Sequence, residues 1–188
     1  MTAVFTIGHS NHKPERFLGL LEDAGIEMVA DVRSTPTSRR MPWFSQAALA
    51  KRLHAAGISY AFFGRELGGR PADAALFTDG VADFERMAAT SAFRAGLKRV
   101  AAEALWLRVA LMCSEKEPLD CHRCLLIGRA LHAEGIAVRH ILADGGMVTQ
   151  MDIERELLAR HGGLGLDEDA LATAYRDRAR KIAFRRAR

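Results

Sequence analysis

Five short segments of this chain are apolar along nearly their whole length, and stretches of helical character separate them. The segments span residues 3–7, 28–32, 58–63, 107–112 and 137–142. Strands that are apolar throughout, instead of alternating apolar with polar, are typical of a sheet covered on both faces. The pattern therefore predicts an α/β fold: an open, three-layer, mostly parallel sheet of about five strands with helices on both faces. A closed eight-stranded barrel would need more strands.

Helices are predicted where apolar residues recur at helical spacing between a start signal and a stopping glycine. The predicted helices span residues 14–24, 45–56, 81–104, 120–134, 151–160 and 168–180. Ser45 and Asp120 are the expected N-caps of two of them, and a break near Thr90 is expected in the third. We expect an α/β domain over residues 1–150 and a C-terminal helical extension with a basic tail over residues 151–188.

Basic charge is concentrated in two stretches of the chain. The 188 residues carry a net charge of only +4, yet residues 33–70 and residues 175–188 each carry +6. Such local excess favours a phosphorylated or polyanionic partner, either an anionic small molecule or a nucleic acid. For the C-terminal tail alone, an ordinary solvated surface is the preferred explanation.

The three cysteines all lie between Cys113 and Cys124. A secreted disulfide framework normally needs an even and dispersed set, so a reducing, cytoplasmic location is expected. No apolar run approaches the length needed to cross a bilayer, so we expect no membrane partner.

Chemically reactive residue types follow the predicted strands. In an open parallel sheet, ligands bind beyond the carboxyl ends of the strands. The residues at those positions are His9, Ser10, Asp31, Arg33, Ser38, Arg39, Gly68, Gly69, Arg70, Cys113, Glu115, Cys121, His122 and Arg123. We expect their four segments to meet around one positively charged hollow. Arg33 and Arg123 on opposite sides of the molecule would contradict that expectation.

The residue types indicate two roles within this hollow. An anion would be held by arginines, since guanidinium groups bind phosphate and carboxylate through paired hydrogen bonds: Arg33, Arg39, Arg70 and Arg123. Glu115 or His122 would move protons, and Cys113 or Cys121 would be the nucleophile. Cys121 is expected near the first turn of a helix, where the helix dipole favours a thiolate.

Simpler structural roles remain open for several of these residues. The cysteines can equally be small buried apolar side chains. Gly68 and Gly69 can form a backbone nest for phosphate, although a plain turn is the commoner structure. Asp31 and Arg33 can form a structural ion pair at a strand end.

The cysteines also allow a redox or a metal hypothesis. Cys121 and Cys124 have the spacing of a redox pair, but a thioredoxin-like motif follows its strand directly, whereas eight residues separate Met112 from Cys121. Adjacent helical residues such as Cys121 and His122 point about 100° apart, which disfavours a shared zinc ion. We therefore predict no metal site, and the sequence specifies no cofactor.

Four motifs occur in a characteristic order: TIGHS at 6–10, DVRSTPTSR at 31–39, LGGRP at 67–71 and MCSEKEPLDCHR at 112–123. Together they resemble the domain of unknown function 488 family over about residues 3–145. The resemblance implies a small α/β domain without an agreed activity. It also implies importance for His9, Ser10, Asp31, Arg33, Pro36, Ser38, Leu67, Gly68, Gly69, Cys113, Glu115, Cys121, His122 and Arg123. Cys124 lies outside the pattern.

Three functions fit these observations. The preferred one is an enzyme that acts on a phosphate-bearing or other anionic substrate, such as a nucleotide or nucleic acid. The alternative is a nucleic-acid-binding module without catalysis, which the two basic segments and Trp43 favour. The third is a thiol redox or metal protein. A purely electrostatic binder does not need Cys113, Glu115 and Cys121, so the sequence favours the enzyme.

Overall fold

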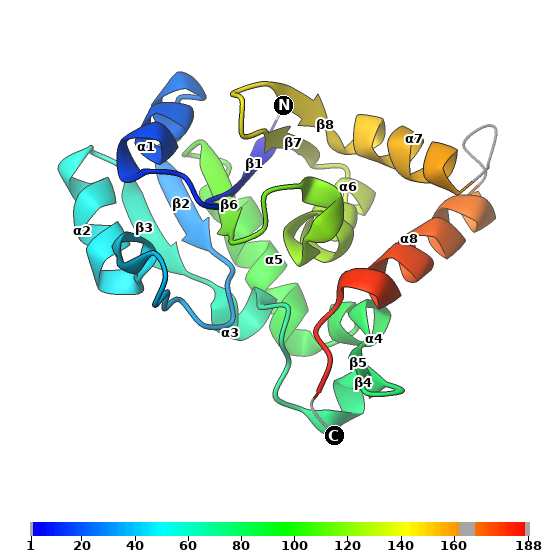
Figure 1. Ribbon diagram of the computed structural model, residues 1–188. Coiled ribbons are helices and arrows are strands. Elements are labelled where there is room, and N and C mark those ends of the chain that lie inside the picture. The colour runs from blue at the N-terminus through cyan, green and yellow to red at the C-terminus, as the bar shows by residue number, and fades with distance from the viewer. Residues whose placement is uncertain (1, 162–167, 187–188) are drawn as a thin grey trace.

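The computed structural model describes residues 2–161 and 168–186, and its centre is a six-stranded sheet (Figure 1). The strands are β1 (Ala3–Gly8), β2 (Met28–Asp31), β3 (Ser59–Phe62), β6 (Val109–Cys113), β7 (Ala137–Ile141) and β8 (Met147–Thr149). They lie in the order β3-β2-β6-β1-β7-β8. Neighbours among the first five pair in parallel, whereas β8 pairs antiparallel with β7. The predicted α/β class is confirmed.

The expected count of five strands is corrected to six. The five predicted segments form the parallel part of the sheet, and β8 is added at its edge by a hairpin through Gly145. This strand is three residues long and only partly buried. It therefore lacks the continuous apolar run by which the other strands were recognised.

Helices cover both faces of the sheet. The α-helices are α1 (Pro14–Asp23), α2 (Gln46–Ala55), α3 (Gly64–Leu67), α4 (Phe84–Ala88), α5 (Ser91–Glu103), α6 (Arg129–Ala133), α7 (Gln150–Arg160) and α8 (Glu168–Ile182). Shorter elements are the 3-10 turns η1 (Pro42–Phe44), η2 (Ala74–Leu76) and η3 (Pro118–Asp120), the π-helical turn η4 (Arg123–Gly128), and the small hairpin β4 (Phe77–Thr78) and β5 (Val81–Ala82).

The two faces of the sheet bury separate apolar clusters. Helices α1 and α2 place Phe17, Leu21 and Leu53 against one face. Helix α5, turn η4 and helices α6 to α8 cover the other face, where Leu97 and Leu125 are buried. Both clusters draw on β1, β2 and β6, because successive side chains of a strand point to opposite faces. The parallel strands are therefore held centrally, and their carboxyl ends are fixed relative to one another.

Three helix starts differ from the prediction. Ser45 precedes α2, but its side chain makes no capping bond to the helix and instead accepts a hydrogen bond from the backbone N–H of Ser38. Asp120 does not cap a helix, because it ends the turn η3. The predicted helix over 81–104 is a short strand followed by α4 and α5, and Thr90 caps α5 at the expected break.

The C-terminal segment packs on the same core as the α/β part. Leu157 and Tyr175 are buried in the apolar cluster of the second face. Beyond α8 the chain lies beside the small hairpin, where the backbone N–H of Ala82 donates to the carbonyl of Phe184. Tail arginines pair with the body of the protein, as Arg178 does with Asp120. This segment therefore contributes to the wall of the site described below.

Among the residues that the structure describes, no helix combines the length and apolar character needed to cross a membrane.

Candidate functional site

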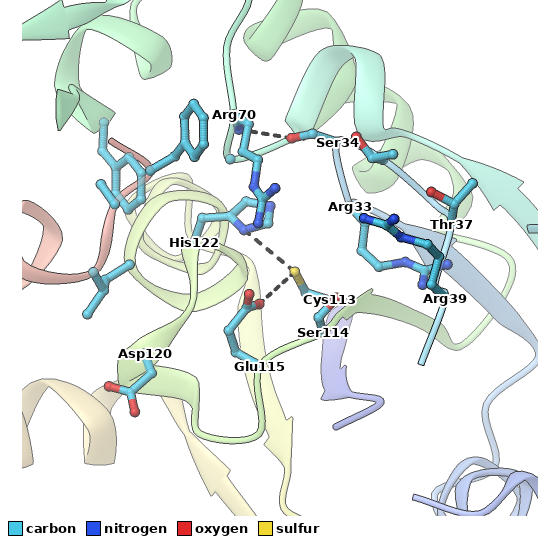
Figure 2. Close-up of a pocket in the computed structure, with 16 residues that line it drawn as sticks. Arg33, Ser34, Thr37, Arg39, Arg70, Cys113, Ser114, Glu115, Asp120 and His122 are labelled. Atoms are coloured by element: carbon cyan, nitrogen blue, oxygen red, sulfur yellow. Dashed lines mark hydrogen bonds between the residues drawn. The ribbon is translucent and has the colours of Figure 1, made fainter. Parts of the chain in front are cut away.

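A pocket of about 400 Å³ opens at the carboxyl ends of β2 and β6 (Figure 2). Its walls carry predicted site residues from three separate segments of the chain: Arg33, Arg39, Gly69, Arg70, Cys113, Glu115 and His122. The expected meeting of distant segments at one rim of the sheet is thus observed for these residues. The volume lies within the roughly 300–1,000 Å³ typical of small-molecule sites.

A cluster of two thiols, a carboxylate and an imidazole lies at one side of this pocket. Oε2 of Glu115 is 2.9 Å from Sγ of Cys113 and 3.0 Å from Sγ of Cys121. Nδ1 of His122 is 3.7 Å from the first sulfur and 3.8 Å from the second. Glu115 is an exposed residue, yet its carboxylate turns inward to the sulfurs, as Figure 2 shows for Cys113. We call these four residues the thiol cluster.

The backbone after β6 explains why the thiol cluster can form. Pro118 begins the turn η3, and Cys121 follows it in an extended conformation with φ −138° and ψ 141°. The helical backbone starts only at His122. Cys121 and His122 are therefore not consecutive helical residues. The expectation that their side chains point about 100° apart on a helix is wrong. Both side chains turn toward Cys113 at the end of β6.

Hydrogen bonds at the start of η4 hold Cys121 in place. Its carbonyl accepts from the backbone N–H groups of Cys124 and Leu125. Its sulfur accepts from the backbone N–H of Arg123 at 3.4 Å. The thiol thus takes the position of a capping group at the beginning of a helical segment, where a negative charge is favoured.

The surroundings move the pKa values of the two thiols in opposite directions. Burial raises the pKa of Cys113 well above its ordinary range, and its neighbours Cys121 and Glu115 raise it further. Burial also opposes ionisation of Cys121, but the hydrogen bond with Cys113 and the charge of Arg123 bring the pKa of Cys121 well below its ordinary range. Burial and the charge of Cys121 raise the pKa of Glu115. Negative charge therefore gathers on Cys121, which is 1% exposed and lies behind the pocket wall.

Two exposed arginines stand at the rim of the pocket. Arg39 lies in the loop after β2, and Arg70 follows α3. The backbone N–H of Arg70 donates to Oγ of Ser34 at 2.9 Å, which ties the two loops together. The guanidinium of Arg70 also lies 5.2 Å from the ring centre of Phe184. Both arginines can bind an anion that enters from solvent.

Arg33 reaches the pocket from a more enclosed position. It is 4% exposed, and its guanidinium binds the buried Asp31 through Nε at 2.9 Å and Nη2 at 2.6 Å. Asp31 also accepts a hydrogen bond from the hydroxyl of Tyr60 at 2.8 Å. Asp31 therefore positions Arg33 and does not face a ligand. The structural ion pair considered from the sequence is present in this structure.

The structure does not place Arg123 on the pocket. Its side chain is fully buried, and it donates to the carbonyls of Glu115 at 2.7 Å and Lys116 at 2.9 Å. It therefore holds the loop that carries Glu115 and puts a positive charge beside Cys121. An anion-binding role through direct contact does not fit this position. Arg123 nevertheless lies at the same edge of the sheet as Arg33, because its Nη2 would be 3.2 Å from a Cβ on Gly8 at the end of β1, and Arg33 follows the end of β2.

His9, Ser10 and Ser38 are also absent from the pocket wall. Nδ1 of His9 donates to the carbonyl of Ser10, and its Nε2 accepts from Nη1 of Arg33 at 3.3 Å. Burial, followed by the charge of Arg33, lowers the pKa of His9 to about 4. Ser38 Oγ accepts from the N–H of Met41 within the loop. These three residues support the loops around the site.

Gly68 and Gly69 provide close packing. Neither has a positive φ, so the alternating backbone of an anion nest is not formed. A Cβ at Gly69 would lie 2.8 Å from Cγ of His122. The absence of a side chain at Gly69 is therefore what lets the imidazole lie against this loop.

We predict that Gly69→Ala destabilises the protein by about 1–3 kcal/mol, the usual cost of overpacking. The added methyl group has to displace the imidazole of His122 from the thiols. Urea denaturation measures the cost, with Gly19→Ala as the comparison, because a Cβ at Gly19 in helix α1 meets open space and the backbone there has no positive φ. Equal thiol reactivity in the Gly69→Ala variant and the native protein would contradict the predicted displacement.

Comparison with known proteins adds one finding. Residues 13–130 match the family described as "Domain of unknown function DUF488". The chain belongs to this family. No curated protein and no solved structure matches it. The DUF488 match contains the whole pocket-lining part of the chain up to His122, whereas His9 and Ser10 precede it.

Nine residues that line the pocket were not predicted as site residues: Ser34, Thr35, Thr37, Phe84, Ser114, Asp120, Ile182, Ala183 and Phe184. Ser34, Thr35 and Thr37 line the pocket from within a DUF488 motif, and their place between Arg33 and Arg39 was a usable signal. Ile182 and Phe184 line it from the C-terminal segment. They lie far along the chain from the other pocket residues and outside the family match, so no local pattern pointed to them.

Proposed function

We propose that this protein is an enzyme that binds a small phosphate-bearing substrate in the pocket and transforms it beside the thiol cluster. The observation that carries the proposal is one cavity that joins Arg33, Arg39 and Arg70 to Cys113, Glu115 and His122. Guanidinium groups would hold the anion, and a carboxylate, an imidazole and a thiol would face the rest of the molecule. A module that only binds anions does not require that second set.

The positions of the pocket residues indicate which of them bind the substrate and which transfer protons. Arg39 and Arg70 are exposed and meet the substrate first, while Arg33 is fixed by Asp31 and forms the inner positive wall. Glu115 lies on the pocket wall, where it can give or take a proton. Cys121 does not line the pocket, and the raised pKa of Cys113 keeps it a neutral thiol, so we assign the proton transfers to Glu115 and His122 and direct attack to neither sulfur.

Anion binding is the first test. We expect inorganic phosphate, pyrophosphate or a nucleotide to raise the Tm of the protein. Arg39→Ala and Arg70→Ala should each lower the affinity for that anion by about tenfold or more, because hydrogen bonds to charged groups contribute about 1.5–3 kcal/mol. Isothermal titration measures the affinity. Arg155→Ala is the matched control, because Arg155 is an exposed arginine that pairs with Asp152 on α7.

Glu115→Gln separates binding from chemistry. We expect this variant to keep the affinity for the anion and to lose most of the turnover of the substrate that the titration identifies. The proposal fails if no anion of the panel binds at millimolar concentration. It also fails if the Arg39 and Arg70 variants bind as tightly as the Arg155 variant.

A further inference from the structure

The four polar atoms of the thiol cluster lie close enough together to share one metal ion. Sγ of Cys113, Oε2 of Glu115, Sγ of Cys121 and Nδ1 of His122 all lie within 4.8 Å of one another. With Zn–S about 2.3 Å and Zn–N about 2.0 Å, a tetrahedral site has sulfur–nitrogen edges of about 3.5 Å. The sulfur–nitrogen separations here are 3.7 and 3.8 Å, close to such an edge. The sulfur–oxygen separations of Glu115 are 2.9 and 3.0 Å, so its carboxylate has to move outward by about 0.5 Å to act as a ligand.

His122 is oriented as a metal ligand would be. Its Nε2 is 3.0 Å from the carbonyl of Val32, and a carbonyl only accepts, so the proton lies on Nε2. In the neutral ring the lone pair is then on Nδ1, which faces the two sulfurs. A histidine that binds a metal almost always donates its other ring N–H to a carbonyl or carboxylate in this way. Gly69 packs on the ring and fixes its plane.

The buried charge of Arg123 suits a metal-bound cluster as well as a free thiolate at Cys121. Arg123 is fully buried, and within the described residues its hydrogen-bond partners are the neutral carbonyls of Glu115 and Lys116. A buried cation needs a compensating negative charge nearby. Zn²⁺ bound by two thiolates, one carboxylate and a neutral imidazole carries a single negative charge, which Arg123 balances. The N–H of Arg123 that points at Sγ of Cys121 further stabilises a thiolate there.

We propose that the thiol cluster binds one zinc ion, with Cys113, Glu115, Cys121 and His122 as ligands. Thiolate and imidazole ligands in a tetrahedral set favour zinc over magnesium or calcium. Glu115 is the exposed ligand, so it is the one that an incoming molecule can displace. Contact between the bound ion and the substrate rests on the proposed function, whereas zinc binding itself does not.

Zinc binding is tested on the full-length protein with its thiols reduced. After treatment with a chelator, we expect one equivalent of zinc to be taken up in competition with a chromophoric chelator, and the Tm to rise on loading. Cobalt added in place of zinc is expected to give the intense d–d bands of a tetrahedral site and a thiolate-to-cobalt charge-transfer band. Both measurements use the metal alone, so they can fail while anion binding succeeds, and the reverse.

Variants show which residues hold the ion. Cys121→Ser is expected to abolish the tight binding of one zinc ion. Glu115→Gln changes an exposed residue and should lower the zinc affinity by at least the roughly 10- to 100-fold that is typical of changes to residues around the ligands. Cys124→Ser is the control, because Cys124 is buried but contacts Gln150 and is not one of the cluster. It should bind zinc like the native protein.

Three results would overturn the inference. One is no zinc uptake at micromolar concentration by the reduced native protein. Another is uptake that Glu115→Gln and Cys121→Ser leave unchanged, since the ion would then lie elsewhere. The last is a loss of zinc affinity in Cys124→Ser as large as that in Cys121→Ser.

A redox role is a separate outcome. If thiol counting shows a Cys113–Cys121 disulfide and the reduced protein still takes up no zinc, the cluster is a redox pair and not a metal site.

Discussion

Replacing Arg33 by methionine is expected to lower the free energy of unfolding by about 3–5 kcal/mol, the cost of removing one partner from a buried ion pair. Asp31 is 0% exposed and Arg33 is 4% exposed. Without the guanidinium, the buried carboxylate keeps the hydroxyl of Tyr60 and the backbone N–H of residue 33 as donors but loses its positive partner. Urea denaturation at neutral pH measures the loss.

A double variant identifies the cause of that loss. If the uncompensated charge of Asp31 is responsible, adding Asp31→Asn to the Arg33→Met protein should cost much less than Asp31→Asn costs in the native protein. Arg39→Ala serves as the control at the same pocket and should stay within about 0.5 kcal/mol of the native stability, because Arg39 is exposed. A loss below about 1 kcal/mol for Arg33→Met would contradict the role given to the pair.

The sequence predicts the framework of this protein well because the framework has local causes. Each parallel strand is a run of apolar residues between a helix stop and a loop, so five of the six strands are visible without the structure. Their shared direction then places the loops after β2, β3 and β6 at one edge. That is why Arg39, Arg70 and Glu115, which lie far apart in sequence, line one pocket as expected.

The sequence does not determine which way individual side chains point within that edge. Arg33 and Arg123 are both arginines that follow strands of the sheet, yet one lines the pocket and the other is buried beneath the loop of Glu115. The difference depends on buried partners, Asp31 for the first and two backbone carbonyls for the second. Charge counting alone treats the two residues as equivalent.

The thiol cluster shows the same limit at the level of backbone. The sequence predicts that the segment before Arg123 is the first turn of a helix, in which the side chains of Cys121 and His122 point apart. The turn at Pro118 and the extended conformation of Cys121 delay the helix by about two residues, and the side chains converge. A shift of that size lies within the usual uncertainty of a helix boundary, but here it decides whether four ligands can meet.

A buried histidine away from the cluster should make the protein sensitive to acid. His140 on β7 is 0% exposed and forms part of a directional chain of hydrogen bonds. The hydroxyl of Thr6 donates to its Nδ1 at 2.8 Å, and its Nε2 donates to Oε1 of Gln150 at 2.9 Å. The amide of Gln150 donates to the hydroxyl of Tyr175, which donates to Glu154. This chain uses the neutral imidazole.

Burial, followed by the positive charge of Arg123 on the packed turn η4, lowers the pKa of His140 to about 4. In the unfolded chain its pKa is about 6.5, so between these values the unfolded state binds the proton and the folded state does not. The stabilisation from neutral His140 is therefore fully present above pH 6.5 and is lost as the pH falls toward 4. A shift of this size corresponds to about 3 kcal/mol.

His140→Gln tests this assignment, because glutamine can accept from Thr6 and donate to Gln150 but does not titrate. We expect the variant to be less stable than the native protein at pH 7 and the difference to shrink by about 3 kcal/mol by pH 4. Urea denaturation between pH 4 and 7 measures both curves. Parallel curves would show that His140 does not carry the acid sensitivity. His132→Gln is the control, because His132 is 40% exposed and contacts Glu154 instead of His140. It should leave most of the pH dependence of stability in place.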